Sequence, residues 1–189
     1  RGLAITGTGN ADSHTAQLER MGFPVNLVQK GDGSTTAFLN SIKNGNLRVS
    51  SGPLVELVVV ADGEKFGPGH RTVSVGDSVN AIVRVRAAPW VPVPEVRLIQ
   101  DGQIVFEASV GELGPTMTRE WTVPVLLRRD SWIIAEAGWK LGDASRPDGI
   151  YAQVAPGHVP IGFTNPVWLD TDGDGRWTAT EEQAGRAPQ

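Results

Sequence analysis

Apolar and polar residues alternate with a period of two along most of this chain. The clearest example is V-N-A-I-V-R-V-R within residues 78–88. A period of two places successive side chains on opposite faces of a strand, one of them buried. Strands of this kind are predicted at residues 54–61, 78–88, 96–100, 104–108, 117–127 and 131–137. The pairs Asp62-Gly63 and Asp101-Gly102 mark tight turns between them.

Short strands at this spacing, with no helix between them, predict an immunoglobulin-like antiparallel β-sandwich. Residues 161–169 read as a strand broken at Asn165-Pro166. The prolines of residues 89–94 exclude a central strand there, because proline cannot donate to a ladder. Residues 138–158 are rich in Gly, Asp and Pro, which predicts a long surface loop.

The first 53 residues differ from the rest because their pattern predicts a helix as well as strands. Residues 3–8 and 47–51 read as strands, and residues 34–44 read as a helix whose start Ser34 or Thr35 can cap. We therefore place a domain boundary near Pro53. The expected division is a small α/β segment at 1–53, a sandwich at 54–182 and a tail at 183–189.

Residues 170–181, D-T-D-G-D-G-R-W-T-A-T-E, match the EF-hand calcium loop. Loop positions 1, 3 and 5 are Asp170, Asp172 and Asp174, and Gly175 takes the turn at position 6. Arg176 offers its backbone carbonyl at position 7, and Glu181 closes the site at position 12. The pattern predicts a Ca²⁺ site with these residues as ligands.

The alternative interpretation of this loop is an acidic, glycine-rich surface turn. The filled position 12 favours calcium over that alternative. The preceding segment reads as a strand, whereas an EF-hand begins with a long helix. The loop is therefore expected to be a structural staple on a β-structure.

Charge and composition narrow the function further. The 189 residues carry a net charge of −4, no cysteine and no basic stripe, so a nucleic-acid partner is not expected. No run of about 18 apolar residues predicts a membrane span. The chain opens on Arg1 and not on Met, which favours a fragment or processed product. Loose calcium loops work at high calcium, so we expect a periplasmic or extracellular location, as a secreted protein.

Asp12 and His14 lie two residues apart after the first expected strand. In an extended segment, residues i and i+2 project to the same face, so the carboxylate and the imidazole would converge. This is half of a divalent transition-metal site. An Asp in a turn beside a surface His is equally compatible with the spacing alone.

The segment G-N-A-D-S-H-T, followed by a helix and then by R-V-S-S-G-P, resembles the closing portion of a PHP-family metallohydrolase. This is the polymerase and histidinol phosphatase family. The resemblance is strongest to its CehA/McbA-like branch, whose members carry a β-sandwich after the catalytic domain. It implies that residues 1–53 end a PHP-type barrel. It also implies that Asp12 and His14 match the family's last metal-binding motif, with Zn²⁺, Mn²⁺ or Fe²⁺ as the metal.

The resemblance also implies what the chain lacks. Family members take most of their metal ligands from motifs near the start of the domain, and two ligands are too few for a catalytic site. We therefore expect no catalytic residue here and an inactive fragment of a hydrolase. The missing N-terminal portion would be its partner, and a small ester its substrate. The alternative is a non-catalytic, calcium-binding sandwich module that binds glycan or protein.

Overall fold

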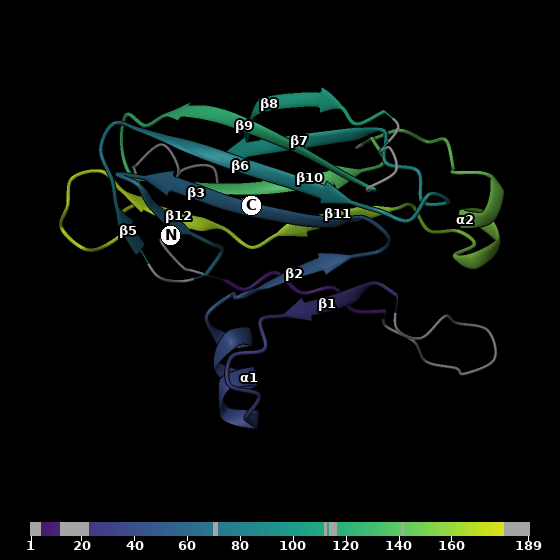
Figure 1. Ribbon diagram of the computed structural model, residues 1–189, viewed down its shortest axis with the longest axis horizontal. Coiled ribbons are helices and arrows are strands. Elements are labelled where there is room, and N and C mark those ends of the chain that lie inside the picture. Colours follow the sequence, from purple (N-terminus) through teal and green to yellow (C-terminus); the bar gives the residue numbers. More distant parts are fainter. Residues whose placement is uncertain are drawn as a thin grey trace, which may run out of the picture.

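The structure is a computed structural model, and it describes residues 5–11, 23–69, 72–111, 113, 117–140 and 142–179. Within these residues, twelve strands form two sheets, and two short helices lie outside them (Figure 1). The elements are β1 (Val25–Val28), α1 (Thr35–Lys43), β2 (Leu47–Ser50), β3 (Leu54–Ala61), β4 (Glu64–Phe66), β5 (Thr72–Ser74), β6 (Ser78–Arg86), β7 (Glu95–Gln100), β8 (Gln103–Ser109), β9 (Thr118–Leu126), β10 (Ser131–Gly138), α2 (Gly149–Val154), β11 (Ile161–Thr164) and β12 (Val167–Asp170). The predicted mainly-β, antiparallel sandwich is confirmed.

The small sheet has the strand order β4-β3-β6-β9, and every pair in it is antiparallel. Strand β3 buries every second residue, as the alternating pattern predicts. Asp62 and Gly63 connect β3 to β4 with φ angles of 51° and 82°. Two positive φ angles are what a two-residue hairpin turn needs, and glycine adopts the second without strain.

The large sheet is organised around β10, which pairs with β7 along one edge and with β11 and β12 along the other. Strands β7 and β8 form the hairpin predicted around Asp101-Gly102. Strand β12 continues to β5 in a parallel pair, whereas β11 continues to β2 and then β1. The large sheet therefore has two arms beyond β10.

Those two arms depend on a break in one strand. Glu136 lies opposite Phe163, but Ile133 lies opposite Val167, so three residue steps on β10 face four on its neighbour. Such an extra residue is a β-bulge. The break predicted at Asn165-Pro166 is confirmed, and it separates β11 from β12.

The unit β1-α1-β2 extends the large sheet. Helix α1 begins after Ser34, whose side chain accepts the N–H of Ala37 at 3.1 Å, so the predicted helix is confirmed. Leu47 and Val49 of β2 are buried, and β2 pairs with β11. Strands on either side of residue 53 therefore share one sheet, while α1 projects away from the sandwich (Figure 1).

Residues 5–11 follow β11 and β1 without joining the ladder, so the strand expected at residues 3–8 is wrong for its described part. Two asparagine side chains replace a partner strand. Asn165 accepts from the N–H of Gly7 at 2.7 Å and donates to its carbonyl at 3.1 Å. Asn26 makes the same pair of hydrogen bonds with Gly9. A side-chain amide presents one donor and one acceptor as a peptide group does, which satisfies this backbone without a strand.

The long surface loop expected at residues 138–158 is also wrong, because α2 lies within it. Tyr151 of α2 is completely buried, and its hydroxyl donates to the Ser51 carbonyl at 2.6 Å. Ala155, which follows the helix, is buried too. One buried tyrosine therefore fixes a segment whose composition is typical of loops.

The core lies between the two sheets and consists mainly of valine, leucine and alanine from β3, β6, β7 and β10. Branched residues dominate because they fit a pleated, buried surface. In the part of the chain that the structure describes, no helix is long and apolar enough to cross a membrane.

Candidate metal centre

Strand β12 ends on a carboxylate that is completely removed from water. All four residues of β12 are buried, and Asp170 is 0% exposed. Its Oδ1 accepts the N–H of Gly173 at 2.7 Å, and its Oδ2 accepts the N–H of Gly175 at 2.9 Å. The hydroxyl of Ser74, on the neighbouring β5, donates to Oδ2 at 2.9 Å. The core of the sandwich thus fixes loop position 1.

The loop after β12 bends through a series of short hydrogen bonds. Asp172 Oδ1 accepts the N–H of Asp174, and Asp174 Oδ1 accepts the N–H of Arg176. Gly173 and Gly175 have φ angles of 75° and 81°. These angles favour glycine, because a Cβ strains this backbone conformation. The glycine expected at position 6 is therefore the residue that the turn requires.

A fourth aspartate, which the loop pattern did not reveal, comes from the connection between β9 and β10. Asp130 is 5% exposed. Its Oδ1 accepts the N–H and the hydroxyl of Thr171 at 2.9 and 3.1 Å, and its Oδ2 accepts the N–H of Thr178 at 2.9 Å. Asp130 therefore holds both ends of the loop against the neighbouring strand connection.

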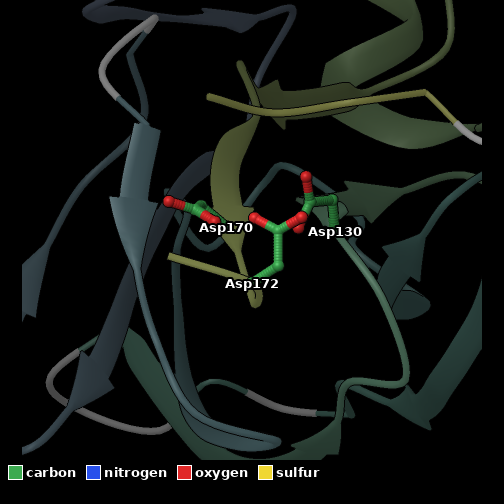
Figure 2. A group of neighbouring side chains, drawn as sticks. All are labelled: Asp130, Asp170 and Asp172. Atoms are coloured by element: carbon green, nitrogen blue, oxygen red, sulfur yellow. The ribbon is translucent and has the colours of Figure 1, made fainter. Parts of the chain in front are cut away.

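Carboxylate oxygens of Asp130, Asp170 and Asp172 lie within 4.8 Å of one another. Figure 2 shows the Asp172 carboxylate between the other two. Two like charges 4 Å apart repel by about 1 kcal/mol in water and by about 4 kcal/mol near a protein surface. Asp170 and Asp172 are brought together as the sequence predicts, and Asp130 joins them.

The pKa values of two of these carboxyls respond to this arrangement in opposite directions. Burial raises the pKa of Asp170, but hydrogen bonds from Ser74, Gly175 and Gly173 outweigh burial and leave that pKa lowered. The Asp174 amide lowers the pKa of Asp172. Burial, the contact with Asp170 and the charges of Asp174 and Asp130 outweigh that amide and leave the Asp172 pKa raised. Of the two carboxyls, the buried Asp170 is therefore the later to take up a proton as the pH falls.

Trp177 attaches the loop to the sheet from the other side. Its ring packs edge-on against Trp168 of β12, with centroids 4.7 Å apart. Trp168 is itself largely buried. This apolar side chain at loop position 8 therefore anchors the loop to the sheet.

The other predicted ligands are not part of the aspartate cluster that the structure describes. Asp174 is exposed and is not in the group within 4.8 Å, and Arg176 contributes its N–H to the turn. Glu181, at position 12, lies outside the described residues, as do Asp12 and His14 of the transition-metal half-site. The structure therefore leaves those three ligands as predictions.

The clustered donors are carboxylate oxygens, the type of ligand that hard cations prefer. Carboxylate and carbonyl oxygens without thiolate or imidazole suit Ca²⁺ or Mg²⁺, and Ca²⁺ accepts six to eight oxygens in flexible geometry. No family model, curated protein or solved structure matches this chain. The assignment of a function therefore depends on the site's own geometry.

Proposed function

We propose that this chain is a β-sandwich module stabilised by one calcium ion, held by the loop that begins at Asp170. The observation that carries this proposal is the completely buried Asp170 carboxylate with the carboxylates of Asp130 and Asp172 beside it. Buried charges are normally paired or bound to a metal. Among the residues that the structure describes, no lysine or arginine forms an ion pair with this group.

The ion would join segments that are far apart in the sequence. Asp170 already contacts Ser74 at the end of β5, and Asp130 already contacts Thr171 and Thr178. A cation among these carboxylates would replace repulsion by attraction at the point where three segments meet. Its role would be structural, because the loop begins directly after strand β12 and is tied to the Asp130 connection and to Trp168.

Calcium removal tests this proposal. At a calcium concentration a hundredfold above the dissociation constant, the folded state gains about 2.7 kcal/mol. For a chain of this size, that gain raises the melting temperature by about 5–10 °C. We expect this rise when CaCl₂ replaces EDTA in a thermal unfolding experiment followed by circular dichroism. We also expect Asp172→Ala to abolish it.

Asp143→Ala is the matched control. Asp143 is an exposed aspartate that also accepts a backbone N–H two residues on, from Ser145 at 2.8 Å. It has the same local turn chemistry without the neighbouring carboxylates. The control should keep the full response to calcium, and equal melting of the parent chain in CaCl₂ and EDTA would reject the calcium site.

A second proposal concerns the complete protein. We infer that the unit around α1 closes a PHP-like metallohydrolase domain, with Asp12 and His14 as two of its metal ligands. It is favoured by apolar side chains of α1 that face water, since Phe38 and Leu39 are 47% and 50% exposed. A helix that buries neither residue in the sandwich has a face for another part of the protein to cover. Metals bound there would activate water for ester hydrolysis.

Activity and gene structure test this second proposal. The 189-residue chain should not hydrolyse bis(4-nitrophenyl) phosphate with Mn²⁺ or Zn²⁺, because two protein ligands do not complete a catalytic site. Measurable metal-dependent turnover by this chain would contradict its incompleteness. The reading frame before the codon for Arg1 should encode further His and acidic motifs. A frame without them would leave the calcium-stabilised module alone, with glycan or protein as its binding partner.

A further inference from the structure

A groove between β1, β2 and the outer face of the small sheet combines charge with apolar surface. Its volume is about 910 Å³. Strands β1 and β2 line one side, and the outer faces of β3, β6 and β9 line the other. None of the three clustered aspartates contributes to it. Volumes of about 300–1,000 Å³ are typical of small-molecule sites.

The charges of the groove are organised around Glu56. Arg48 Nη1 lies 3.0 Å from Glu56 Oε1, and Arg84 Nη1 lies 3.3 Å from Oε2. Arg86, just outside the groove lining, also reaches Oε1 at 2.8 Å. Glu120 holds Arg84 from the other side at 2.6 Å. These contacts keep the guanidinium groups in place before any ligand binds.

The basic side chains outnumber the acidic ones. Arg48, Arg84 and Lys65 line the groove together with Glu56 and Glu120, and Arg86 beside the lining adds to the positive excess. Arg84 uses its Nε, Nη1 and Nη2 atoms on the two glutamates, whereas Arg48 contacts Glu56 through Nη1. A guanidinium fork binds a carboxylate through two parallel N–H groups. Arg48 is therefore the best placed to receive an added anion.

Beside these charges lies half-buried apolar surface. Val28 of β1, Val58 of β3 and Ile82 of β6 all line the groove, and none of them is fully covered. Val58 and Ile82 are on the outer face of the small sheet, which in an isolated sandwich faces water. Strands β1 and β2 convert this part of the face into a recess.

We propose that this groove binds a small amphiphilic carboxylate, with its head group at Arg48 and its apolar body over Val58 and Ile82. The net positive charge of the groove matches an anion. The apolar floor adds affinity in proportion to the area that a hydrocarbon body covers. This binding is independent of calcium, because the groove shares no ligand residue with the acidic loop.

Octanoate is the probe that combines both features, and three compounds separate them. Octanol keeps the chain without the charge, acetate keeps the charge without the chain, and octylammonium reverses the charge. Octanoate should bind at least about tenfold more tightly than each of them, because a charge-assisted hydrogen bond and a covered chain each contribute that much. Calorimetric titration measures the affinities, and amide shifts in nuclear magnetic resonance locate the ligand among β2, β3 and β6.

Two variants test the charge of the groove. Lys65→Glu changes an exposed side chain of β4 and leaves the Glu56 ion pairs intact, so it should fold normally and weaken octanoate at least about tenfold. Arg48→Gln should weaken it by a similar factor. Arg146→Glu makes the same charge change as Lys65→Glu in an exposed loop away from the groove, and it should bind octanoate like the parent chain.

Several results would overturn the proposal. If octanol or octylammonium bound as tightly as octanoate, the basic side chains would not be recognising the carboxylate. Unchanged octanoate affinity in both Lys65→Glu and Arg48→Gln would lead to the same conclusion. Amide shifts confined to other surfaces, or no detectable binding at millimolar octanoate, would show that the groove does not take this class of ligand.

Discussion

Two carboxylates of this protein are withdrawn from water in opposite electrostatic settings. Glu56 contacts Arg48, Arg84 and Arg86. Burial raises its pKa, but the charges of Arg48, Arg86 and Arg84 outweigh burial and leave the pKa lowered. Asp170 is more deeply buried and has only N–H and O–H donors, with other aspartates beside it. The chain neutralises the first carboxylate itself and leaves the second negative.

The difference indicates which region should respond to an added ion. A carboxylate that already has three guanidinium partners gains little from a cation. A buried carboxylate beside two others gains much, because the cation removes their repulsion and satisfies their remaining lone pairs. Four changes test this contrast, beginning with the one expected to have the largest effect.

Asp170→Asn should cause the largest loss. It removes the buried charge and turns one acceptor oxygen into a donor that faces the N–H of Gly173 or Gly175. We expect a loss of about 3 kcal/mol in the free energy of unfolding, because hydrogen bonds to a buried charge are lost. Urea unfolding in CaCl₂ and in EDTA measures both this loss and the calcium response, which should disappear. The exposed Asp143→Asn is the control, and a calcium response retained by Asp170→Asn would contradict the assignment.

Asp130→Asn should have a smaller effect of the same kind. The amide can still accept the N–H of Thr171 or of Thr178, but not both. Calcium affinity should fall about tenfold, equivalent to about 1.4 kcal/mol, while saturating calcium still stabilises the variant. A calorimetric calcium titration measures this change. Unchanged affinity would mean that Asp130 only fastens the loop.

Tyr151→Phe tests a buried polar group that carries no charge at neutral pH. Burial raises the pKa of Tyr151 to about 12 from its usual 10.0, partly offset by the hydrogen bond to Ser51. Because the folded state holds this proton more tightly, the stabilisation is complete below pH 10 and is lost as the pH rises to about 12. Unfolding curves of the parent chain should show a loss of about 1–2 kcal/mol across that window, and those of Tyr151→Phe should lack this component. Parallel alkaline profiles would contradict it.

Glu56→Gln should have the smallest effect, about 1 kcal/mol or less, because its partners are partly exposed arginines. The folded-state pKa of Glu56 is below its usual 4.5. Its contribution should therefore be present above pH 4.5 and be lost as the pH falls through the lowered pKa. Urea unfolding from about pH 6 to about pH 3, with exposed Glu64→Gln as the control, measures it. If EDTA lowered the free energy of unfolding of Glu56→Gln by a clearly different amount from that of the parent chain, the contrast between Glu56 and Asp170 would be contradicted.

The sequence predicted the structural elements that are determined by residues close to one another in the chain. The alternation in β3 and β6, the Asp-Gly turns and the loop from Asp170 each depend on neighbours within a few residues, so they could be read directly. Ser34 likewise identified the start of α1. Local patterns of this kind indicate a strand or a turn without reference to contacts with distant parts of the chain.

The features that escaped prediction depend on contacts between distant residues. Asp130 sits in an ordinary turn and gains its role only because Thr171 and Thr178 are brought to it. Tyr151 depends on the carbonyl of Ser51, a hundred positions earlier. Residues 3–8 look like a strand, but in the described part of this segment the side chain of Asn165 bonds the backbone of Gly7 in place of a partner strand. One signal was available for Tyr151: it is the single tyrosine of the chain, in a segment otherwise typical of loops.

The bulge at Asn165-Pro166 determines to which face of the sheet each side chain of β12 points. Side chains alternate between the two faces of a strand, so deleting either residue would rotate β12 by half a period. Asp170 would then point away from Ser74, and the loop would start on the wrong side of the sheet. One inserted residue thus decides which face receives the carboxylate, and a single-codon deletion there would dismantle the proposed ion site with all of the aspartates still present.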